Sequence, residues 1–260
     1  MNTDSTIITV NNLSKSFDNP VLKNISFSIK TGEVIGYIGP NGAGKSTTIK
    51  ILTGIIPDFE GTVNILGFDV KKDPMEVKRR IGYIPENAAL YDTLTPLEYL
   101  HFIGQLYGLE RGTIDKKAKD LLHVFELDNN INSRMTTFSK GMRQKVLLIA
   151  GLVHNPSIIF LDEPLSGLDA NAVILVKEIL MQLKKSGKTI FYSSHIMDVV
   201  EKISDKIMII NKGELIANDT FAELNAKASS GSLEKLFTQL TGNQEHASSA
   251  GEFINILERN

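Results

Sequence analysis

The sequence predicts an α/β fold with a helical segment inserted into it. A short apolar run, a glycine-rich loop and a helical pattern follow one another over residues 34–52. The spacing of apolar residues becomes helical over residues 95–135, and short strand-like runs return over residues 156–210. Strands that alternate with helices indicate a parallel sheet. A chain of 260 residues is long enough for one large domain with a satellite lobe.

The first thirty residues predict strands and turns. Ile7–Val10 is rich in β-branched residues, and Asn24–Lys30 alternates apolar with polar positions. Val34–Ile38 then predicts a short buried strand that ends at the glycine-rich loop. From Thr47 onward, apolar residues at helical spacing predict a helix that ends near Gly54.

The segment that follows predicts a helical lobe. Thr95 can cap a helix, and Pro96 suits the first helical position. Glu98 would complete a capping box with Thr95. A second helix is predicted over Asp115–Phe125, so this stretch forms a lobe inserted between two parts of the α/β core.

Beyond residue 155, the pattern returns to short strands around one helix. Ile158–Leu161 is apolar on both faces, as strands of parallel sheets are. Residues 171–185 predict a helix, and Thr189–Ser193 and Ile207–Ile210 predict two further strands. This alternation continues the α/β core that precedes the helical lobe.

Composition excludes several classes of function. The formal net charge of -2 indicates no general attraction to nucleic acid or anionic lipid. The absence of cysteine excludes disulfides, thiolate zinc sites and cysteine nucleophiles. Residues 1–5 lack the character of a signal peptide, and apolar stretches such as Val146–Val153 are too short to span a bilayer. We therefore expect another chain to supply any membrane part.

The glycine-rich loop carries the first chemical motif. Gly39–Ser46 reads GPNGAGKS and matches the phosphate-loop pattern G-x-x-x-x-G-K-[ST]. Glycines let phosphates approach the backbone, and the N-terminus of the following helix offers N–H donors. The lysine can reach the β- and γ-phosphates, and the serine hydroxyl can ligate Mg²⁺. The candidate binding residues are Gly39, Asn41, Gly42, Ala43, Gly44, Lys45, Ser46 and Thr47.

This loop alone predicts only a nucleoside triphosphate site, because kinases, GTPases and motor proteins share it. Asn211–Glu214 superficially resembles the guanine-reading N-K-x-D motif, but its fourth residue is wrong. The same segment reads well as a hairpin turn between Ile207–Ile210 and Leu215–Ala217. We therefore favour a turn over a GTPase motif.

Two carboxylates follow the apolar strand Ile158–Leu161. Because open α/β sheets bind ligands at the carboxyl ends of their strands, Asp162 is placed to hold Mg²⁺, directly or through water. Glu163 is the candidate to orient and polarise an attacking water. The alternative is that residues 162–164 form a simple polar turn.

A third motif makes a family recognisable. Phe138–Lys145 reads FSKGMRQK and resembles the ABC signature, usually written LSGGQ-x-Q-[RK]. Ser166–Asp169 resembles the D-loop of the same family, and His195 resembles its switch histidine. Phe17 resembles the aromatic residue on which adenine stacks. These elements stand in family order over residues 7–220, which is far more specific than any one motif.

The resemblance implies a P-loop NTPase core with an N-terminal antiparallel β subdomain and an inserted helical subdomain. It divides the chain into a core (residues 1–90 and 154–220), a helical signature subdomain (91–153) and a C-terminal tail (221–260). It also implies that two cassettes sandwich two ATP molecules head to tail.

In that arrangement, Ser139 and the Gly141 backbone would contact the γ-phosphate bound by the other cassette. Asp169 would couple the two sites, and His195 would hold the γ-phosphate and the water. Each residue also has an ordinary structural interpretation: Ser139 as a helix cap, His195 as a structural residue, and Phe17 as packing beneath the sheet.

The chain departs from the family pattern at Glu86, in the signature, and at Leu165, which replaces a common threonine. Glu86 stands where the Q-loop glutamine is usual; it can ligate Mg²⁺ but adds a negative charge beside the phosphates. Lys140 replaces a glycine and Met142 a glutamine of the signature. The signature changes resemble those of exporter cassettes that are made as separate ATPase chains.

The resemblance therefore implies an ATP-hydrolysing, Mg²⁺-dependent subunit of an ABC transporter, expected to be an exporter. Its expected partners are a second cassette, identical or related, and a transmembrane permease that holds it at the cytoplasmic face of the membrane. No nucleic acid is expected. The alternative is a soluble ABC ATPase that acts on a ribosome, DNA or a regulatory partner; such proteins usually carry two cassettes or long coiled-coil insertions, which this sequence lacks.

Overall fold

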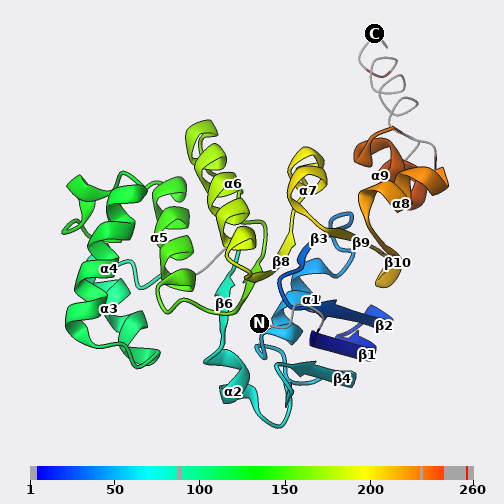
Figure 1. Cartoon of the computed structure of the whole chain (residues 1–260), viewed down its shortest axis with the longest axis horizontal. Coiled ribbons are helices and arrows are strands. Elements are labelled where there is room, and N and C mark those ends of the chain that lie inside the picture. The colour runs from blue at the N-terminus through cyan, green and yellow to red at the C-terminus, as the bar shows by residue number, and fades with distance from the viewer. Residues whose placement is uncertain (1–4, 87–89, 229–230, 243–255, 257–260) are drawn as a thin grey trace.

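The structure is a computed structural model that describes residues 5–86, 90–228, 231–242 and 256. Its centre is a six-stranded sheet in the order β10-β9-β3-β8-β7-β6 (Figure 1). Five strands are parallel, and β10 pairs with β9 in antiparallel fashion. The strands are β3 (Val34–Ile38), β6 (Ile81–Ile84), β7 (Ile158–Leu161), β8 (Thr189–Ser193), β9 (Lys206–Asn211) and β10 (Glu214–Asp219).

Two hydrophobic cores lie on opposite faces of this sheet. Successive residues of a strand point to opposite faces, so in β3 Ile38 joins one core while Ile35 and Tyr37 join the other. Strand β8 divides in the same way, with Tyr192 in the first core and Phe191 in the second. The prediction of strands buried on both faces is therefore confirmed.

A second, antiparallel sheet packs on one side of the central sheet, in the order β2-β1-β4-β5. Its strands are β1 (Thr6–Ser16), β2 (Pro20–Lys30), β4 (Glu60–Ile65) and β5 (Phe68–Asp69). In β2, the alternating residues Ile25, Phe27 and Ile29 are buried. Both long strands extend beyond the apolar runs that predicted them, because their outer halves also pair with each other, with Leu13 opposite Ile25.

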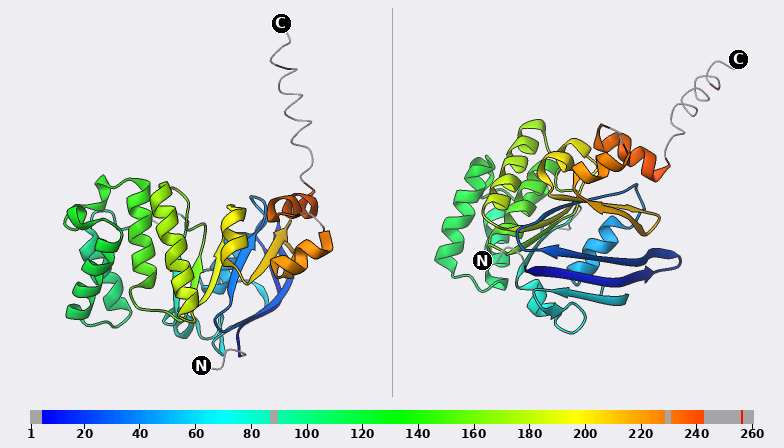
Figure 2. Two further views of the ribbon diagram at one scale, coloured as in Figure 1. Left: turned by 45° about the horizontal axis from the view of Figure 1, so that its top comes forward. Right: turned by 45° about the vertical axis from the view of Figure 1, so that its right-hand side comes forward.

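Helices cover both faces of the central sheet. Helix α1 (Lys45–Leu52) lies between the two sheets, and α6 (Ala170–Lys185) and α7 (Met197–Ile203) lie on the opposite face (Figure 2). The short helix α2 (Pro74–Lys78) precedes β6. Helices α8 (Phe221–Ala228) and α9 (Leu233–Thr241) follow β10, and Leu236 of α9 is buried in the same core as α7.

The inserted lobe contains α3 (Pro96–Leu106), α4 (Arg111–Val124), α5 (Lys140–Leu152) and two short 3₁₀ turns, Asp128–Asn130 and Met135–Thr137. The predicted capping box is present: the Thr95 hydroxyl accepts from the Glu98 N–H, and the Glu98 carboxylate accepts from the Thr95 N–H. Helix α4 begins four residues earlier than predicted. Its first turn buries Ile114. The sequence did not predict this turn, because Gly112 within it is a weak helix former.

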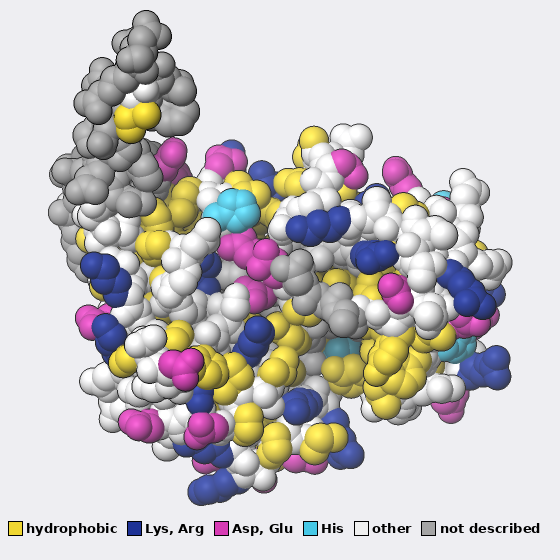
Figure 3. Space-filling view, turned by 180° about the vertical axis from the view of Figure 1, so that it is seen from behind, with side chains coloured by type: hydrophobic (Ala, Val, Ile, Leu, Met, Phe, Trp, Pro, Cys, Tyr) yellow, Lys and Arg dark blue, Asp and Glu magenta, His cyan; other side chains and the backbone are white. Residues whose placement is uncertain are grey.

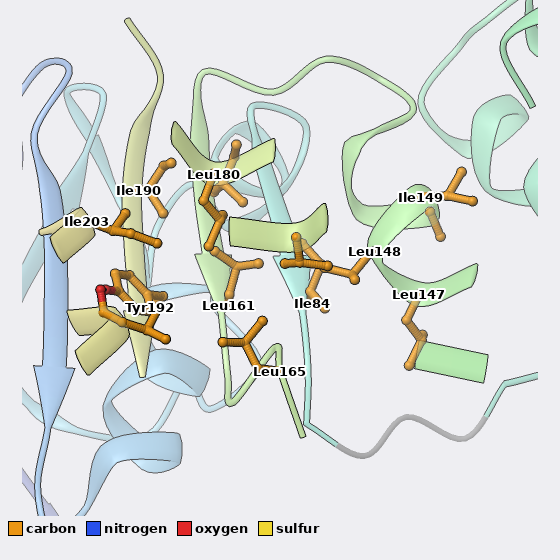
Figure 4. Close-up of a cluster of buried hydrophobic side chains, with 14 of the residues drawn as sticks. Ile84, Leu147, Leu148, Ile149, Leu161, Leu165, Leu180, Ile190, Tyr192 and Ile203 are labelled. Atoms are coloured by element: carbon orange, nitrogen blue, oxygen red, sulfur yellow. The ribbon is translucent and has the colours of Figure 1, made fainter. Parts of the chain in front are cut away.

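The lobe and the sheet share one core. Figure 4 shows Leu148 of α5 extending toward Ile84 of β6, with Leu161 of β7 beyond it. The two backbones also approach closely, since a Cβ on Gly82 of β6 would collide with the carbonyl oxygen of Gly151 in α5. Helix α5, whose start carries the signature motif, is therefore packed against β6 near its C-terminal end.

Candidate functional site

The phosphate loop joins the end of β3 to the start of α1. The Lys45 ammonium donates to the Gly39 carbonyl oxygen at 2.7 Å and to the Pro40 carbonyl oxygen at 3.2 Å, so it lies inside the loop. Helix α1 begins at Lys45 rather than at Thr47. The reason is that Gly44 has a φ of 111°, in the left-handed region, and the helix starts directly after it.

Two glycines of the loop are required by close packing. A Cβ on Gly39 would collide with the carbonyl oxygen of Ile210, at the end of β9. A Cβ on Gly44 would lie 2.5 Å from the side chain of Leu22, in β2. The loop therefore packs between the antiparallel sheet and β9. This packing fixes the direction of the N–H groups of the loop.

The hairpin turn between β9 and β10 supports this loop from behind. The Gly213 N–H donates to the Ala43 carbonyl oxygen at 3.2 Å, and the Gly213 carbonyl accepts from the Lys23 N–H at 2.8 Å. The antiparallel pairing of β9 with β10 confirms the prediction of a turn at Asn211–Glu214. Sequence reasoning missed its second role as a support of the phosphate loop, because no local pattern reveals that contact.

The two carboxylates stand at the carboxyl end of β7. Asp162 is only 3% exposed, and its Oδ1 accepts a hydrogen bond of 2.7 Å from the Ser193 hydroxyl. The same hydroxyl accepts from the Glu163 N–H at 2.9 Å. Glu163 has a φ of 49°, which is uncommon for a residue other than glycine. This buried, specific bonding argues against a simple polar turn.

Glu163 also forms a hydrogen bond with His195. The His195 ring Nδ1 donates to Oε2 of Glu163 at 2.7 Å, and the His195 N–H reaches the same oxygen at 3.3 Å. The histidine side chain is 67% exposed, whereas that of Glu163 is 13% exposed. The carboxylate is therefore held by a residue that itself faces solvent.

One cavity of about 830 Å³ brings most candidate residues together. On the face shown in Figure 3, acidic side chains gather next to a histidine near the middle of the molecule. Gly39, Ala43 and Asp162 are buried beside or beneath the loop rather than lining the cavity. The lining residues are Val21, Asn41, Gly42, Gly44, Lys45, Ser46, Thr47, Glu86, Glu163 and His195.

Burial and neighbouring charges act in opposite directions on the pKa of Lys45. Its burial lowers the pKa of the ammonium below its ordinary value, because the charged form loses solvation. The negative charges of Glu163, Asp162 and Glu86 oppose that effect, in this order of size. Glu86, the residue at the Q-loop position, thus acts on the same lysine as the carboxylate pair.

The donor set of the cavity fits Mg²⁺ shared with a nucleotide. Among the residues that the structure describes, no group of three or more His, Asp or Glu side chains could hold a metal ion alone. Mg²⁺ in phosphate sites is typically bound by one or two carboxylates or hydroxyls together with phosphate oxygens and water. Ser46 and Glu86 line the cavity, and buried Asp162 lies behind it, so the residues present suit that mode.

The signature residues stand apart from this cavity. Neither Ser139 nor Gly141 is among the described residues that line it. Ser139 caps α5, and its hydroxyl accepts from the Met142 N–H at 3.2 Å. A Cβ on Gly141 would lie 3.0 Å from the Gly167 carbonyl oxygen, so the signature packs on the D-loop of its own chain.

Lys140 strengthens the contact between signature and D-loop. Its ammonium donates to the Ser166 hydroxyl at 3.4 Å, and its methylene groups cover Gly167. Asp169 closes the D-loop as the cap of α6, accepting from the Ala172 N–H at 2.9 Å. That backbone hydrogen bond, with help from the positive charge of Lys145, lowers the pKa of Asp169.

Phe17 lies in the turn between β1 and β2 and is 58% exposed. The Lys15 ammonium lies 4.8 Å from the centre of its ring. Such exposure argues against packing beneath the sheet. Phe17 is not among the described residues that line the cavity, so its role in stacking adenine stays a prediction.

Comparisons with known proteins identify the family of the chain. Residues 22–166 match the family model described as ABC transporter. The chain is 39% identical over 214 residues to the linearmycin resistance ATP-binding protein LnrL of Bacillus subtilis (strain 168), covering 82% of this chain and 69% of that protein.

Solved structures give the same result. The structure of an ATP binding subunit of an ABC transporter superposes with a TM-score of 0.84 at 33% identity, covering 90% of this chain and 99% of the other. A dimeric, post-hydrolysis structure of the ATP-binding cassette MJ0796 with ADP and Pi superposes with a TM-score of 0.76 at 25% identity, covering 82% and 98%.

Proposed function

Since the chain belongs to the ABC transporter family and is an ATP-binding subunit with ATPase activity, we propose that it powers an exporter through a separate permease chain. Two cassettes bind head to tail around two ATP molecules, and hydrolysis releases them. The second cassette is another copy of this chain or a related ATPase.

The observation that carries this proposal is the division of the site. The cavity holds Lys45, Glu163 and His195, whereas Ser139 lies at the start of α5, away from the described lining. The N–H groups at the start of α5 suit an anion, because they carry the partial positive charge of the helix N-terminus. A second cassette that brings its Ser139 to this cavity would complete the γ-phosphate site.

The proposed roles follow from the contacts. Lys45 and the N–H groups around Asn41–Thr47 bind the phosphates, and Phe17 stacks on adenine. Glu163 polarises the attacking water, while His195 orients the Glu163 carboxylate and reaches the γ-phosphate. Little covalent chemistry falls to the protein in phosphoryl transfer, so positioning and charge neutralisation supply most of the rate.

Ser46, Asp162 and Glu86 would hold Mg²⁺ together with the phosphates. The ion would neutralise negative charge on the β- and γ-phosphates. Asp162 is held for this role by the Ser193 hydroxyl, and Glu86 is the member of the set that departs from the family pattern.

The proposal of export rests on the relatives and on the surface of the lobe. The similar protein LnrL is named for resistance to linearmycin, which suits a role in export. Within the described residues, no helix is long and apolar enough to cross a membrane. A permease would therefore hold the chain at the cytoplasmic face of the membrane.

An exposed aromatic pair offers a surface for that permease. Tyr91 and Phe102 are both exposed and pack edge to face with ring centres 5.5 Å apart. Both residues follow Glu86 in the chain; residues 87–89, just after Glu86, lie outside the described part of the chain. Exposed aromatic residues are typical anchors of protein interfaces. We propose that a short cytoplasmic helix of the permease binds them.

The proposed division into a core (residues 1–90 and 154–220), a signature lobe (91–153) and a tail (221–260) accords with this arrangement. The lobe would carry both the surface that binds the permease and the signature that contacts the ATP of the other cassette. A movement of the lobe would therefore displace both together.

Affinity purification of the tagged chain from detergent-solubilised membranes tests the proposal. We expect a multi-span membrane protein to copurify, and Phe102→Glu to abolish its recovery. Ile174→Glu, at an exposed apolar residue of α6, should not reduce recovery. Recovery with ribosomes or DNA, or equal behaviour of the two variants, would contradict this assignment.

A further inference from the structure

The hydroxyl of Ser193 connects the two functional carboxylates. Ser193 is the last residue of β8 and is completely buried. Its hydroxyl donates to Oδ1 of Asp162 at 2.7 Å and accepts from the N–H of Glu163 at 2.9 Å. One side chain thus binds the carboxylate of one residue and the backbone of the next.

These two bonds fix different properties of the site. The bond to Oδ1 sets the orientation of the Asp162 side chain, whose burial leaves it little contact with water. The bond to the backbone holds Glu163 in its left-handed conformation, with a φ of 49°. Such a conformation is strained for a residue other than glycine and persists only when surrounding contacts impose it.

Ser193 also belongs to the segment that carries the histidine. His195 follows it by two residues and returns to Oε2 of Glu163 with both its N–H and its ring Nδ1. The end of β8 and the residues after it therefore bind Glu163 at two places. Ser193 binds its backbone N–H, and His195 binds its carboxylate. A displacement of this segment would move both contacts together.

We propose that Ser193 is a positioning residue for ATP hydrolysis, which aligns the Asp162 carboxylate and holds the Glu163 backbone in its left-handed conformation. The proposal rests on the roles assigned to Asp162 and Glu163 above. Ser193 is completely buried and is not among the described residues that line the cavity, so it would act through the two residues that it holds.

Removing the hydroxyl should separate hydrolysis from nucleotide binding. In Ser193→Ala, the buried Asp162 oxygen loses its donor and the Glu163 N–H loses its acceptor, so the carboxylates lose their alignment. The phosphate loop is supported by other contacts, from Ile210, Leu22 and Gly213, and should still bind ATP.

The matched control is Thr189→Val. Thr189 lies at the other end of β8, is completely buried and accepts from the Gly32 N–H at 2.9 Å. The change removes one buried hydroxyl from the same strand without touching either carboxylate. Ser193→Cys retains the size of the side chain with a weaker donor and acceptor, and serves if Ser193→Ala fails to fold.

Three measurements are made on each purified variant: the melting midpoint, the affinity for a fluorescent ATP analogue in EDTA and in Mg²⁺, and steady-state kcat and KM. For Ser193→Ala we expect a loss of kcat of at least about tenfold and an affinity in EDTA within about twofold of the parent. The gain in affinity on adding Mg²⁺ should shrink. Ser193→Cys should lie between the parent and Ser193→Ala, and Thr189→Val should retain kcat within about twofold.

The inference is overturned if Ser193→Ala keeps the parental kcat, if Thr189→Val loses as much, or if Ser193→Ala loses affinity in EDTA. Glu163→Gln is measured in parallel. If Glu163→Gln is inactive and Ser193→Ala is fully active, the positioning role alone fails. If Glu163→Gln retains the parental rate, the assignment of Glu163 fails.

Discussion

The ring Nδ1 of His195 and Oε2 of Glu163 lie 2.7 Å apart, and the His195 N–H reaches the same oxygen. Two donors of one residue therefore bind one carboxylate oxygen. Because the histidine is largely exposed while the glutamate is mostly covered, a ligand that contacts the ring from the cavity can change the orientation of the carboxylate. With the roles proposed above, this pair would link recognition of the γ-phosphate to activation of water.

Glu163→Gln should stop hydrolysis while leaving ATP binding intact. The amide oxygen can still accept from His195, but it cannot act as a base, and general base catalysis contributes about 10²–10⁴-fold to rates. We expect kcat to fall at least about 100-fold and a stable dimer to form in MgATP, measured by light scattering after size-exclusion chromatography. Glu178→Gln, on the exposed face of α6, is the control and should behave as the parent does; parental hydrolysis by Glu163→Gln would refute the assignment.

Ser139→Asp should separate helix capping from phosphate contact in trans. Aspartate caps helices as well as serine does, so the melting midpoint should stay close to that of the parent. Its negative charge would meet the γ-phosphate held by the other cassette, so ATP-driven dimerisation and hydrolysis should be lost. ATP binding by the monomer should remain.

Ser139→Arg is the companion variant. It should impair hydrolysis and leave ATP binding by the monomer intact, with loss of the cap costing about 1 kcal/mol of stability. Loss of ATP binding in the monomeric form of either variant would show that Ser139 does not act in trans.

Glu86→Gln should remain active and change the pH profile of kcat/KM, which reports the free enzyme. The Glu86 charge opposes the effect of burial on Lys45, so removing it lowers the pKa of Lys45 further. Since the lysine loses its charge as pH rises through its pKa, the alkaline limb should move to lower pH. The shift should be small, because Glu86 is the weakest of the three carboxylates acting on Lys45.

The control for this shift is Asp120→Asn, at an exposed position of α4, which should leave the profile unchanged. An alkaline limb that stays in place or moves to higher pH in Glu86→Gln would contradict the electrostatic coupling. Complete inactivity would instead indicate that the carboxylate has a specific role in binding metal or moving a proton.

Gly82→Ala should destabilise the junction between sheet and lobe. The added Cβ would collide with the carbonyl oxygen of Gly151 and lie 2.8 Å from Cγ of Pro156. A backbone atom cannot move aside cheaply, and overpacking typically costs 1–3 kcal/mol. Gly112→Ala, where a Cβ meets nothing within 4 Å, should instead stabilise α4 by up to about 1 kcal/mol. Urea unfolding measures both, and equal midpoints would exclude the proposed clash.

Features that depend on neighbours in the chain could be predicted from the sequence. Ile158–Leu161 and Thr189–Ser193 have the predicted bounds, and the capping box of Thr95 and Glu98 is present. Their signals are local, since apolar runs, capping residues and proline act within one or two turns or strands. The phosphate loop and the order of the family motifs belong to the same class.

Features that depend on distant segments could not be predicted. The contact of Gly213 with Ala43 and the bridge from Ser193 to Asp162 join residues far apart in the chain. Serine at the end of a strand and glycine in a turn have many uses, so neither pattern indicates a role. The packing of the Lys140 side chain on Gly167 also joins distant residues and could not be predicted, although Lys140 was noted as a departure from the family motif.

The support of the phosphate loop by Gly213 has a consequence for biosynthesis. Residues 39–46 leave the ribosome early, but the strands that flank β3 and the turn that backs the loop are made much later. Long-range pairing of this kind delays folding, because distant segments must meet before contacts form. The nascent chain can therefore complete the support of its nucleotide site only after Gly213 has been made.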